Sequence, residues 1–269
     1  MRFAVSNIGL PAYDHTSLLG AVRNLGLEGV EVAPSRVWRD TWHGLSGSDV
    51  RAYRKAIEDA GLNVIGLHSL FYDQPSLALF EGLEKRARAI DFLVHLSAVC
   101  RDLGGRTLVL GGGRKRGDTP LETAFHETID FLGDYCNRVE SHGTVLCMEP
   151  LGINDSDFVN SIHDSVRIVD AVGHPALGLQ LDAKALVENG EATFESFDVV
   201  RGRLDHFHAN EPGLNVLGSS HDMPHVVFGD YLRKIGYTGY VSIEQRMLSE
   251  TAPLADTRAS AQVLKESYR

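Results

Sequence analysis

The chain has 269 residues, of which 43% are hydrophobic, and a net charge of −10 at pH 7. This length and apolar content are sufficient for a sizeable buried core. The acidic balance argues against a nucleic-acid partner, because proteins that bind the phosphate backbone normally present a basic face.

Eight short apolar segments alternate with longer segments of helical period from one end of the chain to the other. The predicted strands, in chain order, are residues 3–7, 29–33, 64–69, 107–112, 145–150, 177–182, 204–209 and 240–245. The predicted helices between them include residues 17–26, 48–61, 88–104, 124–143 and 165–173. These helical segments end in glycine, which commonly follows the last turn of a helix.

Strict alternation of strands and helices predicts a parallel sheet with crossover helices. Eight such units in this length fit one closed (β/α)₈ TIM barrel over residues 1–269 better than an open doubly wound sheet. The glycine pattern GxGxxG, which a dinucleotide-binding fold would show after its first strand, is absent.

The remaining composition indicates a cytoplasmic protein. Cys100, Cys136 and Cys147 are far apart, match no zinc or redox spacing, and are predicted to be buried thiols. The first residues read directly as a strand without a basic leader, and no apolar stretch approaches the roughly 20 residues that span a bilayer. We therefore expect no membrane partner.

The last four predicted strands each carry an ionisable side chain at or near the C-terminal end: Glu149, Asp182, His208 and Glu244. Side chains of a strand alternate between its two faces, so neighbours such as Leu181 and Ile243 would face the helices and these four groups the barrel interior. Catalytic groups of TIM barrels cluster at this end of the strands. We expect the four groups to converge there.

Three carboxylates in a barrel mouth repel one another and resist the loss of water. A divalent cation resolves this conflict, and a structural set of ion pairs is the alternative. No inward lysine or arginine is predicted on these strands to form such pairs, which favours a metal. Three carboxylates and one imidazole suit a single divalent ion, with Mn²⁺, Mg²⁺ or Co²⁺ preferred and Zn²⁺ as the alternative.

These four residues on strands five to eight resemble the metal site of the xylose isomerase-like TIM-barrel superfamily. Residues 30–34, 66–70 and the closing segment GYTGYVSIEQ, residues 236–245, carry the same resemblance, which covers essentially the whole chain. The superfamily includes ketose 3-epimerases, hydroxypyruvate isomerase, dehydratases and endonuclease IV. Oligomers are common in it, so the resemblance leaves a homo-oligomer open.

The resemblance to the epimerases implies a sugar or cyclitol isomerase or epimerase that acts on a small hydroxyketone through a metal-bound enediolate. Glu149 and Glu244 would be the acid/base pair, and they would also bind the metal together with Asp182 and His208. A metal-dependent dehydratase of a cyclic polyol or keto acid is one alternative. A non-catalytic sugar-binding barrel is another.

Two positions depart from the epimerase pattern. The epimerases usually carry a histidine three residues after the strand-six aspartate, where this chain has Ala185. They also tend to carry an arginine about six residues beyond the strand-seven histidine, where this chain has Leu214. Both family residues contact substrate oxygens, so substrate recognition is expected to differ. The missing histidine also argues against a nuclease with several zinc ions.

Seven further residues are candidate substrate contacts: Glu31, Trp38, His68, Arg114, Arg116, His221 and His225. His68 and Glu31 face inward on the third and second predicted strands. For His68 the alternative is a hydrogen-bonded core histidine. For Glu31 a contact to substrate or to a metal ligand and a structural pair both stay open. Trp38, followed by Trp42, would form an apolar wall over the substrate or pack within its loop.

The other candidates lie in loops at the same end of the barrel. Arg114 and Arg116 follow the glycine run 111–113, where a phosphate or carboxylate could bind, and a solvated loop is the alternative. His221 and His225 lie after the seventh strand and are candidates to replace the polar contacts that the two departures remove.

Overall fold

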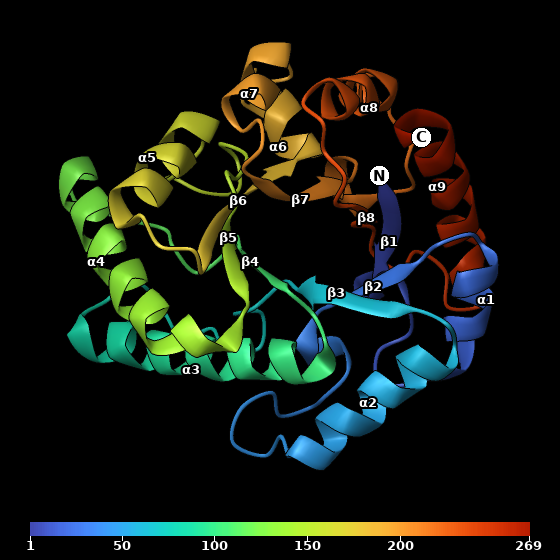
Figure 1. Cartoon of the computed structure of the whole chain (residues 1–269), viewed down its shortest axis with the longest axis horizontal. Helices are drawn as coiled ribbons and strands as arrows, with labels where there is room; N and C mark the ends of the chain where they lie inside the picture. The colour runs from blue at the N-terminus through green and yellow to red at the C-terminus, as the bar shows by residue number, and fades with distance from the viewer.

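The computed structural model describes residues 1–269 and shows eight parallel strands that close into a barrel, surrounded by helices (Figure 1). The strands are β1 Arg2–Ser6, β2 Gly29–Val32, β3 Asn63–Leu67, β4 Thr107–Leu110, β5 Val145–Met148, β6 Leu177–Asp182, β7 Leu204–Ala209 and β8 Tyr240–Ile243. They follow one another in chain order around the barrel, and β1 pairs with β8 to close it. The predicted (β/α)₈ TIM barrel is confirmed.

Nine α-helices cover the outside of the barrel. They are α1 Leu19–Asn24, α2 Gly47–Asp59, α3 Leu83–Leu103, α4 Leu121–Val139, α5 Ile162–Val172, α6 Ala183–Glu188, α7 Phe194–Val199, α8 His225–Lys234 and α9 Pro253–Tyr268. Short 3₁₀ turns add η1 Asn7–Gly9, η2 Thr16–Leu18, η3 Pro34–Arg36, η4 Glu140–His142 and η5 Pro212–Leu214. None of these helices is long and apolar enough to cross a membrane.

Local sequence signals explain several of the helix ends. Ser46 and Ser161 begin α2 and α5, and each exchanges hydrogen bonds with the acidic residue three positions later, so the first free N–H groups are satisfied. Gly104 follows α3 with φ of +86°, a conformation that glycine adopts without steric cost. These signals place the helix ends next to the strands that follow.

The core lies between the barrel strands and the helices. On one side Phe207 of β7 packs against Phe197 of α7, Phe228 of α8 and Tyr268 of α9, and all four are fully buried. Cys100, Cys136 and Cys147 are buried free thiols, as predicted. These apolar side chains fill the layer between the strands and the helices.

Several polar residues of the strands are buried in the barrel. They are Glu31, Gln180, His206 and Ser242. The strand register shifts between Val30 and Glu31 and between Leu179 and Gln180, beside two of these side chains. Such bulges change where a side chain points. Glu31 and Gln180 therefore sit at local irregularities of an otherwise regular barrel.

Candidate metal centre

Glu149, Asp182, His208 and Glu244 converge at the carboxyl ends of β5 to β8. The Nδ1 atom of His208 lies 3.4 Å from Glu149 Oε1, 3.8 Å from Asp182 Oδ2 and 3.6 Å from Glu244 Oε2. Ligand atoms that surround one ion at about 2.1 Å are themselves separated by about 3.0 to 3.4 Å. His208 therefore joins two groups whose ligand atoms lie within 4.8 Å of one another, namely Glu149, Asp182 and His208, and His68, His208 and Glu244. A single divalent ion beside His208 Nδ1 would draw the three carboxylates together.

The backbone fixes two of these carboxylates. Asp182 ends β6 and caps α6, because its Oδ1 accepts a hydrogen bond from the Ala185 N–H at 2.8 Å. Glu149 directly follows β5, and its side chain lies against Gly111 at the end of β4. A Cβ atom at Gly111 would come within 2.2 Å of Glu149 Oε2, so only glycine leaves space for this carboxylate.

Electrostatics at this cluster favour an added positive charge. Burial, together with repulsion from Glu149 and Glu244, raises the pKa of Asp182 to about 8. Burial opposes the charged imidazolium of His208, but the carboxylates of Glu31 and Glu244 outweigh it and hold its pKa well above the usual value. The side chains alone thus retain protons to balance their charge. A divalent cation would take over this role, so the residues fit a metal ion.

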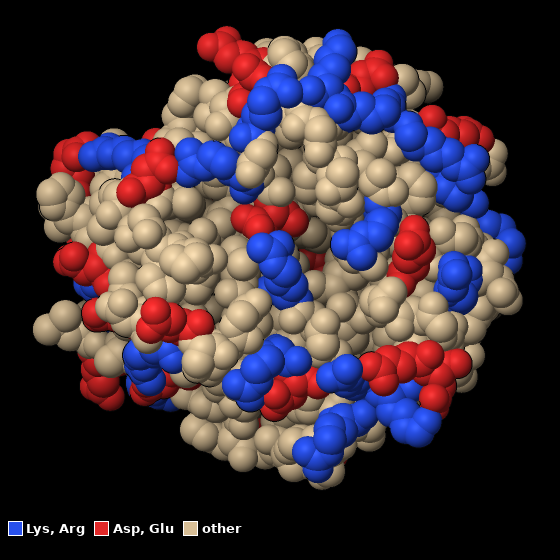
Figure 2. Space-filling model, viewed as in Figure 1, with Lys and Arg blue, Asp and Glu red and all other residues tan.

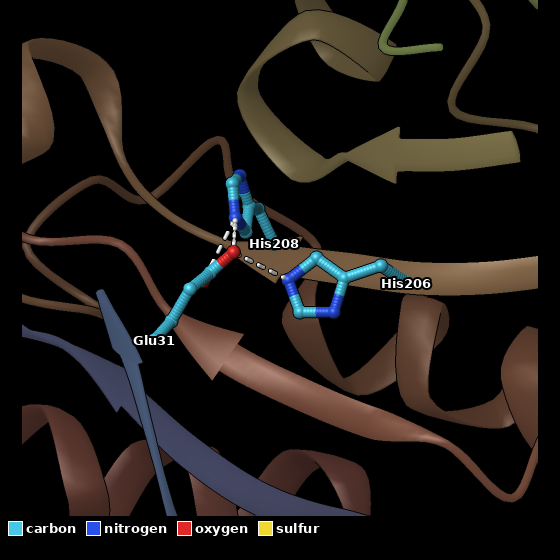
Figure 3. Close-up of side chains that lie close together, drawn as sticks. All are labelled: Glu31, His206 and His208. Atoms are coloured by element: carbon cyan, nitrogen blue, oxygen red, sulfur yellow. Dashed lines mark hydrogen bonds and ion pairs between the residues drawn. The ribbon is translucent and has the colours of Figure 1, made fainter. Parts of the chain in front are cut away.

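Glu31 contacts His208 at Nε2, whereas the other carboxylates lie near Nδ1. Figure 3 shows the Glu31 carboxylate between His208 and His206. Its Oε2 lies 3.0 Å from His208 Nε2, and its Oε1 lies 3.1 Å from His206 Nε2. Burial works against the charge on Glu31, but His206 and His208 hold its pKa well below the usual value. The His208 Nε2–H donates to this carboxylate, which leaves Nδ1 facing the other three carboxylates.

Two amide side chains that were not predicted as site residues also contact the cluster. The Gln180 amide donates to Glu149 Oε1 at 2.9 Å and lies 2.8 Å from His208 Nδ1. The Asn210 amide donates to Asp182 Oδ2 at 2.6 Å and to Glu244 Oε2 at 2.9 Å. Asn210 directly follows β7, two positions after His208, and this alternation with an inward residue was the signal that could have revealed it.

His68 connects β3 to Glu244. Its Nδ1 lies 3.3 Å from Glu244 Oε1, while its Nε2 lies 2.5 Å from the hydroxyl of Ser6 on β1. Burial would raise the pKa of Glu244, but the charges of His208 and His68 lower it to about 2. Glu244 is therefore a carboxylate at neutral pH.

A cavity of about 410 Å³ opens on the cluster, and we call it the mouth cavity. Glu149, His208, Glu244 and His68 lie in its wall. The rest of its wall comes from the β3–α3 and β4–α4 segments, namely Ser69, Leu70, Phe71, Tyr72, Gln74, Pro75, Leu77 and residues 109–113. Figure 2 shows one face of the molecule with interleaved acidic and basic side chains and a hollow near its centre.

The two arginines singled out from the sequence lie outside the mouth cavity. Arg114 is buried and donates to the backbone carbonyls of Phe158, Val159 and Glu149. Arg116 donates to carbonyls of its own loop and of Asp157. Both guanidinium groups bind the chain itself, so they hold the loop that follows β5 rather than line the cavity.

The two tryptophans and two further histidines also lie outside the cavity wall. Trp38 meets Tyr53 edge-on, with ring centres 5.6 Å apart, and Trp42 packs on Phe92. His221 is exposed, whereas His225 is buried between Glu211 and Tyr268. The aromatic wall is formed instead by Phe71 and Tyr72, which follow β3 in a loop that no periodic pattern identifies.

The two positions that depart from the epimerase pattern have different surroundings. A second cavity of about 360 Å³ lies beside the mouth cavity. Ala185 is buried in the first turn of α6 and lines neither cavity. Leu214 lines the neighbouring cavity together with Arg246, and the Arg246 N–H donates to the Leu214 carbonyl at 3.0 Å. An arginine thus stands next to Leu214, on the segment after β8 rather than after β7.

Solved structures with this fold include several sugar epimerases. A D-psicose 3-epimerase with D-tagatose from Clostridium cellulolyticum H10 superposes with a TM-score of 0.83 and 16% identity over 100% of both chains. A 3-keto-D-glucoside 4-epimerase from E. coli gives 0.82 and 18% over 99% of both chains. A D-psicose 3-epimerase in the presence of D-fructose gives 0.80 and 20%, over 99% of this chain and 98% of that one.

The comparison with curated proteins gives no match. The model of the xylose isomerase-like TIM-barrel family, in contrast, matches residues 19–267, which span α1 to α9 and include all four converging residues. The chain therefore belongs to the xylose isomerase-like TIM-barrel family.

Proposed function

We propose that this protein is a divalent-metal-dependent isomerase or epimerase that acts on a sugar or cyclitol with a hydroxyketone group. One observation carries the proposal: Glu149 and Glu244 come from β5 and β8, converge on His208 with Asp182, and line one cavity large enough for a small sugar. The fold that the chain shares with sugar epimerases supports the same class of reaction.

Glu149, Asp182, His208 and Glu244 would hold the ion, which would supply positive charge beside the substrate carbonyl and so stabilise an enediolate. Three carboxylates and one imidazole favour Mn²⁺, Mg²⁺ or Co²⁺, with Zn²⁺ as the alternative.

Glu244 is one candidate base. It is a carboxylate at neutral pH, and contacts from His68 and Asn210 fix its orientation. Glu149 is fixed by Gln180 on the β5 side of the same cavity. A substrate carbon between the two carboxylates would lose a proton to one and regain one from the other on its opposite face. His68 and Ser6 lie behind Glu244 and would hold it in position during this transfer.

A panel of ketoses incubated in deuterium oxide with Mn²⁺ tests the proposal. D-fructose, D-tagatose, L-ribulose, a 3-keto-glucoside and a cyclitol ketone are scored for deuterium at carbon, inversion and loss of water. Deuterium incorporation with inversion or carbonyl transfer is the expected result. Loss of water without inversion would make the protein a dehydratase instead. Binding of a sugar without any exchange would make it a non-catalytic barrel.

A further inference from the structure

The second cavity, of about 360 Å³, lies beside the mouth cavity, and we call it the arginine cavity. Its wall consists of Ile8, Ala33, Ser35, Arg36, Ser69, Tyr72, Leu214, Glu244, Arg246 and Met247. Three of these residues, Ser69, Tyr72 and Glu244, also line the mouth cavity. A molecule that reacts at Glu244 can therefore extend from one cavity into the other.

Two arginines line the arginine cavity without a carboxylate partner. Arg36 is half-buried and uses one nitrogen, Nη2, to donate to the Leu10 carbonyl at 2.6 Å. Arg246 is exposed, and its side chain makes no hydrogen bond or ion pair within the chain. Eight of the other 18 arginines are paired with aspartate or glutamate: Arg54, Arg101, Arg106, Arg138, Arg167, Arg201, Arg203 and Arg233. What sets Arg36 and Arg246 apart is that they line one cavity together with Glu244.

The charge of this wall opposes that of the whole protein. Two cationic side chains face one carboxylate, Glu244, in a chain whose net charge is −10. A guanidinium group offers a planar fork of N–H donors that matches the oxygens of a phosphate or carboxylate. Arg36 is half-buried and Arg246 is exposed, and no carboxylate of the chain occupies the guanidinium N–H groups that an anion here would bind.

We propose that the arginine cavity is an oxyanion subsite, in which Arg36 and Arg246 bind a phosphate or carboxylate at the end of the substrate remote from the reacting carbon. The substrate is then an acidic sugar derivative rather than a neutral ketose. This assignment rests on the proposed function only in placing the reacting carbon beside Glu244. The oxyanion itself is bound by the two arginines and needs no turnover.

Calorimetric titration with inorganic phosphate and, separately, acetate tests the subsite directly. The protein is loaded with Mg²⁺, and chloride keeps the ionic strength constant. Arg36→Met and Arg246→Met should each weaken anion binding by about 10- to 100-fold, the range for a lost charge-assisted bond. Arg246→Lys should fall between wild type and Arg246→Met, because it keeps the charge and loses the fork. Arg88→Met is the matched control, since Arg88 is exposed on α3 without a partner, and it should bind like wild type.

Asp182→Asn separates the subsite from the metal centre. This variant should still bind the anion, because the arginines are intact. Loss of anion binding in Asp182→Asn with wild-type binding in both methionine variants would place the anion on the metal and overturn the proposal. The absence of binding by either anion to wild type at millimolar concentration would also overturn it.

Turnover distinguishes the two sources of the oxyanion. A ketose, its terminal phosphate and the ketouronic acid of the same length are compared in wild type, Arg246→Met and Arg88→Met. Arg246→Met should raise the KM for either the phosphate or the ketouronic acid by about tenfold, and the affected substrate identifies the oxyanion. The KM for the neutral ketose should stay unchanged. Preference for the neutral ketose, with equal effects of Arg246→Met and Arg88→Met, would contradict the proposal. If no substrate turns over, the proposed function fails, and the phosphate and acetate titrations still decide the subsite.

Discussion

The carboxyl ends of β5 to β8 differ from those of β3 and β4, although both border the mouth cavity. The first group supplies Glu149, His208 and Glu244, with Asp182 bonded behind them. The second supplies His68, aromatic and aliphatic side chains, and a run of glycines. We call the first group the charged half of the barrel mouth, because it carries the carboxylates. We call the second the uncharged half, because it contributes no aspartate, glutamate, lysine or arginine to the cavity wall.

Loss of a glutamate on the charged half should have the largest effect. Glu149→Gln and Glu244→Gln keep the shape of the side chain but remove the base, so turnover should fall by about 10²- to 10⁴-fold in each. One of the two variants should still exchange the substrate C–H with solvent, since exchange needs only one base. Glu122→Gln, on the outer surface of α4, is the control. Metal content is measured on the same samples. Near-wild-type inversion in both variants would contradict the two-carboxylate mechanism.

Metal binding should depend strongly on pH, because the charged half holds protons when no ion is present. The Asp182 pKa of about 8 means that an ion must displace a proton below this pH. The Kd for Mg²⁺ should therefore fall by at least about tenfold per pH unit from pH 6 to pH 8 and then level off. Calorimetry in two buffers of different ionisation enthalpy measures the released protons. A Kd that is constant over this range would refute the electrostatic account.

The stability of the metal-free protein should change in the opposite direction. The folded pKa of Asp182 lies above the ordinary value of 3.8, so the folded state binds this proton more tightly than the unfolded state does. The Asp182 contribution is then complete below about pH 4 and is lost as pH rises towards 8. Metal-free protein should show a falling melting temperature across this window, and saturating Mg²⁺ should reverse the trend.

Glu31 should tune the metal centre from outside it. Glu31→Gln weakens the acceptor for His208 Nε2–H and should raise the Kd for metal by about 10- to 100-fold. Glu211→Gln is a matched control, because Glu211 is also buried and bonded to a histidine, His225, that lies outside the mouth cavity. Equal losses of metal affinity in the two variants would indicate general destabilisation instead of a role for Glu31.

The uncharged half should give the smallest effect. Tyr72 is 79% exposed and lines both cavities. Because a partly solvated aromatic contact contributes little binding energy, Tyr72→Ala should raise KM only by about a few-fold. The metal affinity should stay unchanged. Tyr13→Ala removes another exposed tyrosine that lines neither cavity and should have no effect on KM. A change in metal affinity in Tyr72→Ala would contradict the prediction that only the charged half binds the metal.

The sequence predicts the charged half well because strand alternation is a strong constraint. Glu149, Asp182, His208 and Glu244 lie on or directly after strands, where the two-residue period decides which side chains face inward. Closure of the barrel then brings the strand ends together. The same alternation predicts that His68 faces inward, and His68 lies in the wall of the mouth cavity.

The uncharged half is harder to predict because its residues lie in loops. Phe71 and Tyr72 line the cavity while Trp38 and Trp42 do not, although both pairs follow strands at the same end of the barrel. A loop has no period that fixes the direction of its side chains. The β4 end shows the same limit, since Arg114 turns to backbone carbonyls, a partner that sequence spacing does not reveal.

Short helices are harder to delimit. Helices are predicted between strands along the whole chain, but the five with predicted bounds all lie before β6, and after it the structure has α6 and α7 of six residues each and the longer α8. Six residues are too few for an apolar stripe of period 3.6 to be recognised. The cap is a more useful signal there, because Asp182 begins α6 and is also one of the four converging residues.

Anomalous diffraction from crystals soaked in Mn²⁺ tests the central claim most directly. The account predicts one strong manganese peak within bonding distance of Glu149, Asp182, Glu244 and His208 Nδ1, with His208 Nε2 still bonded to Glu31. No peak at this position under saturating Mn²⁺, or a peak between Glu31, His206 and His208 instead, would contradict it.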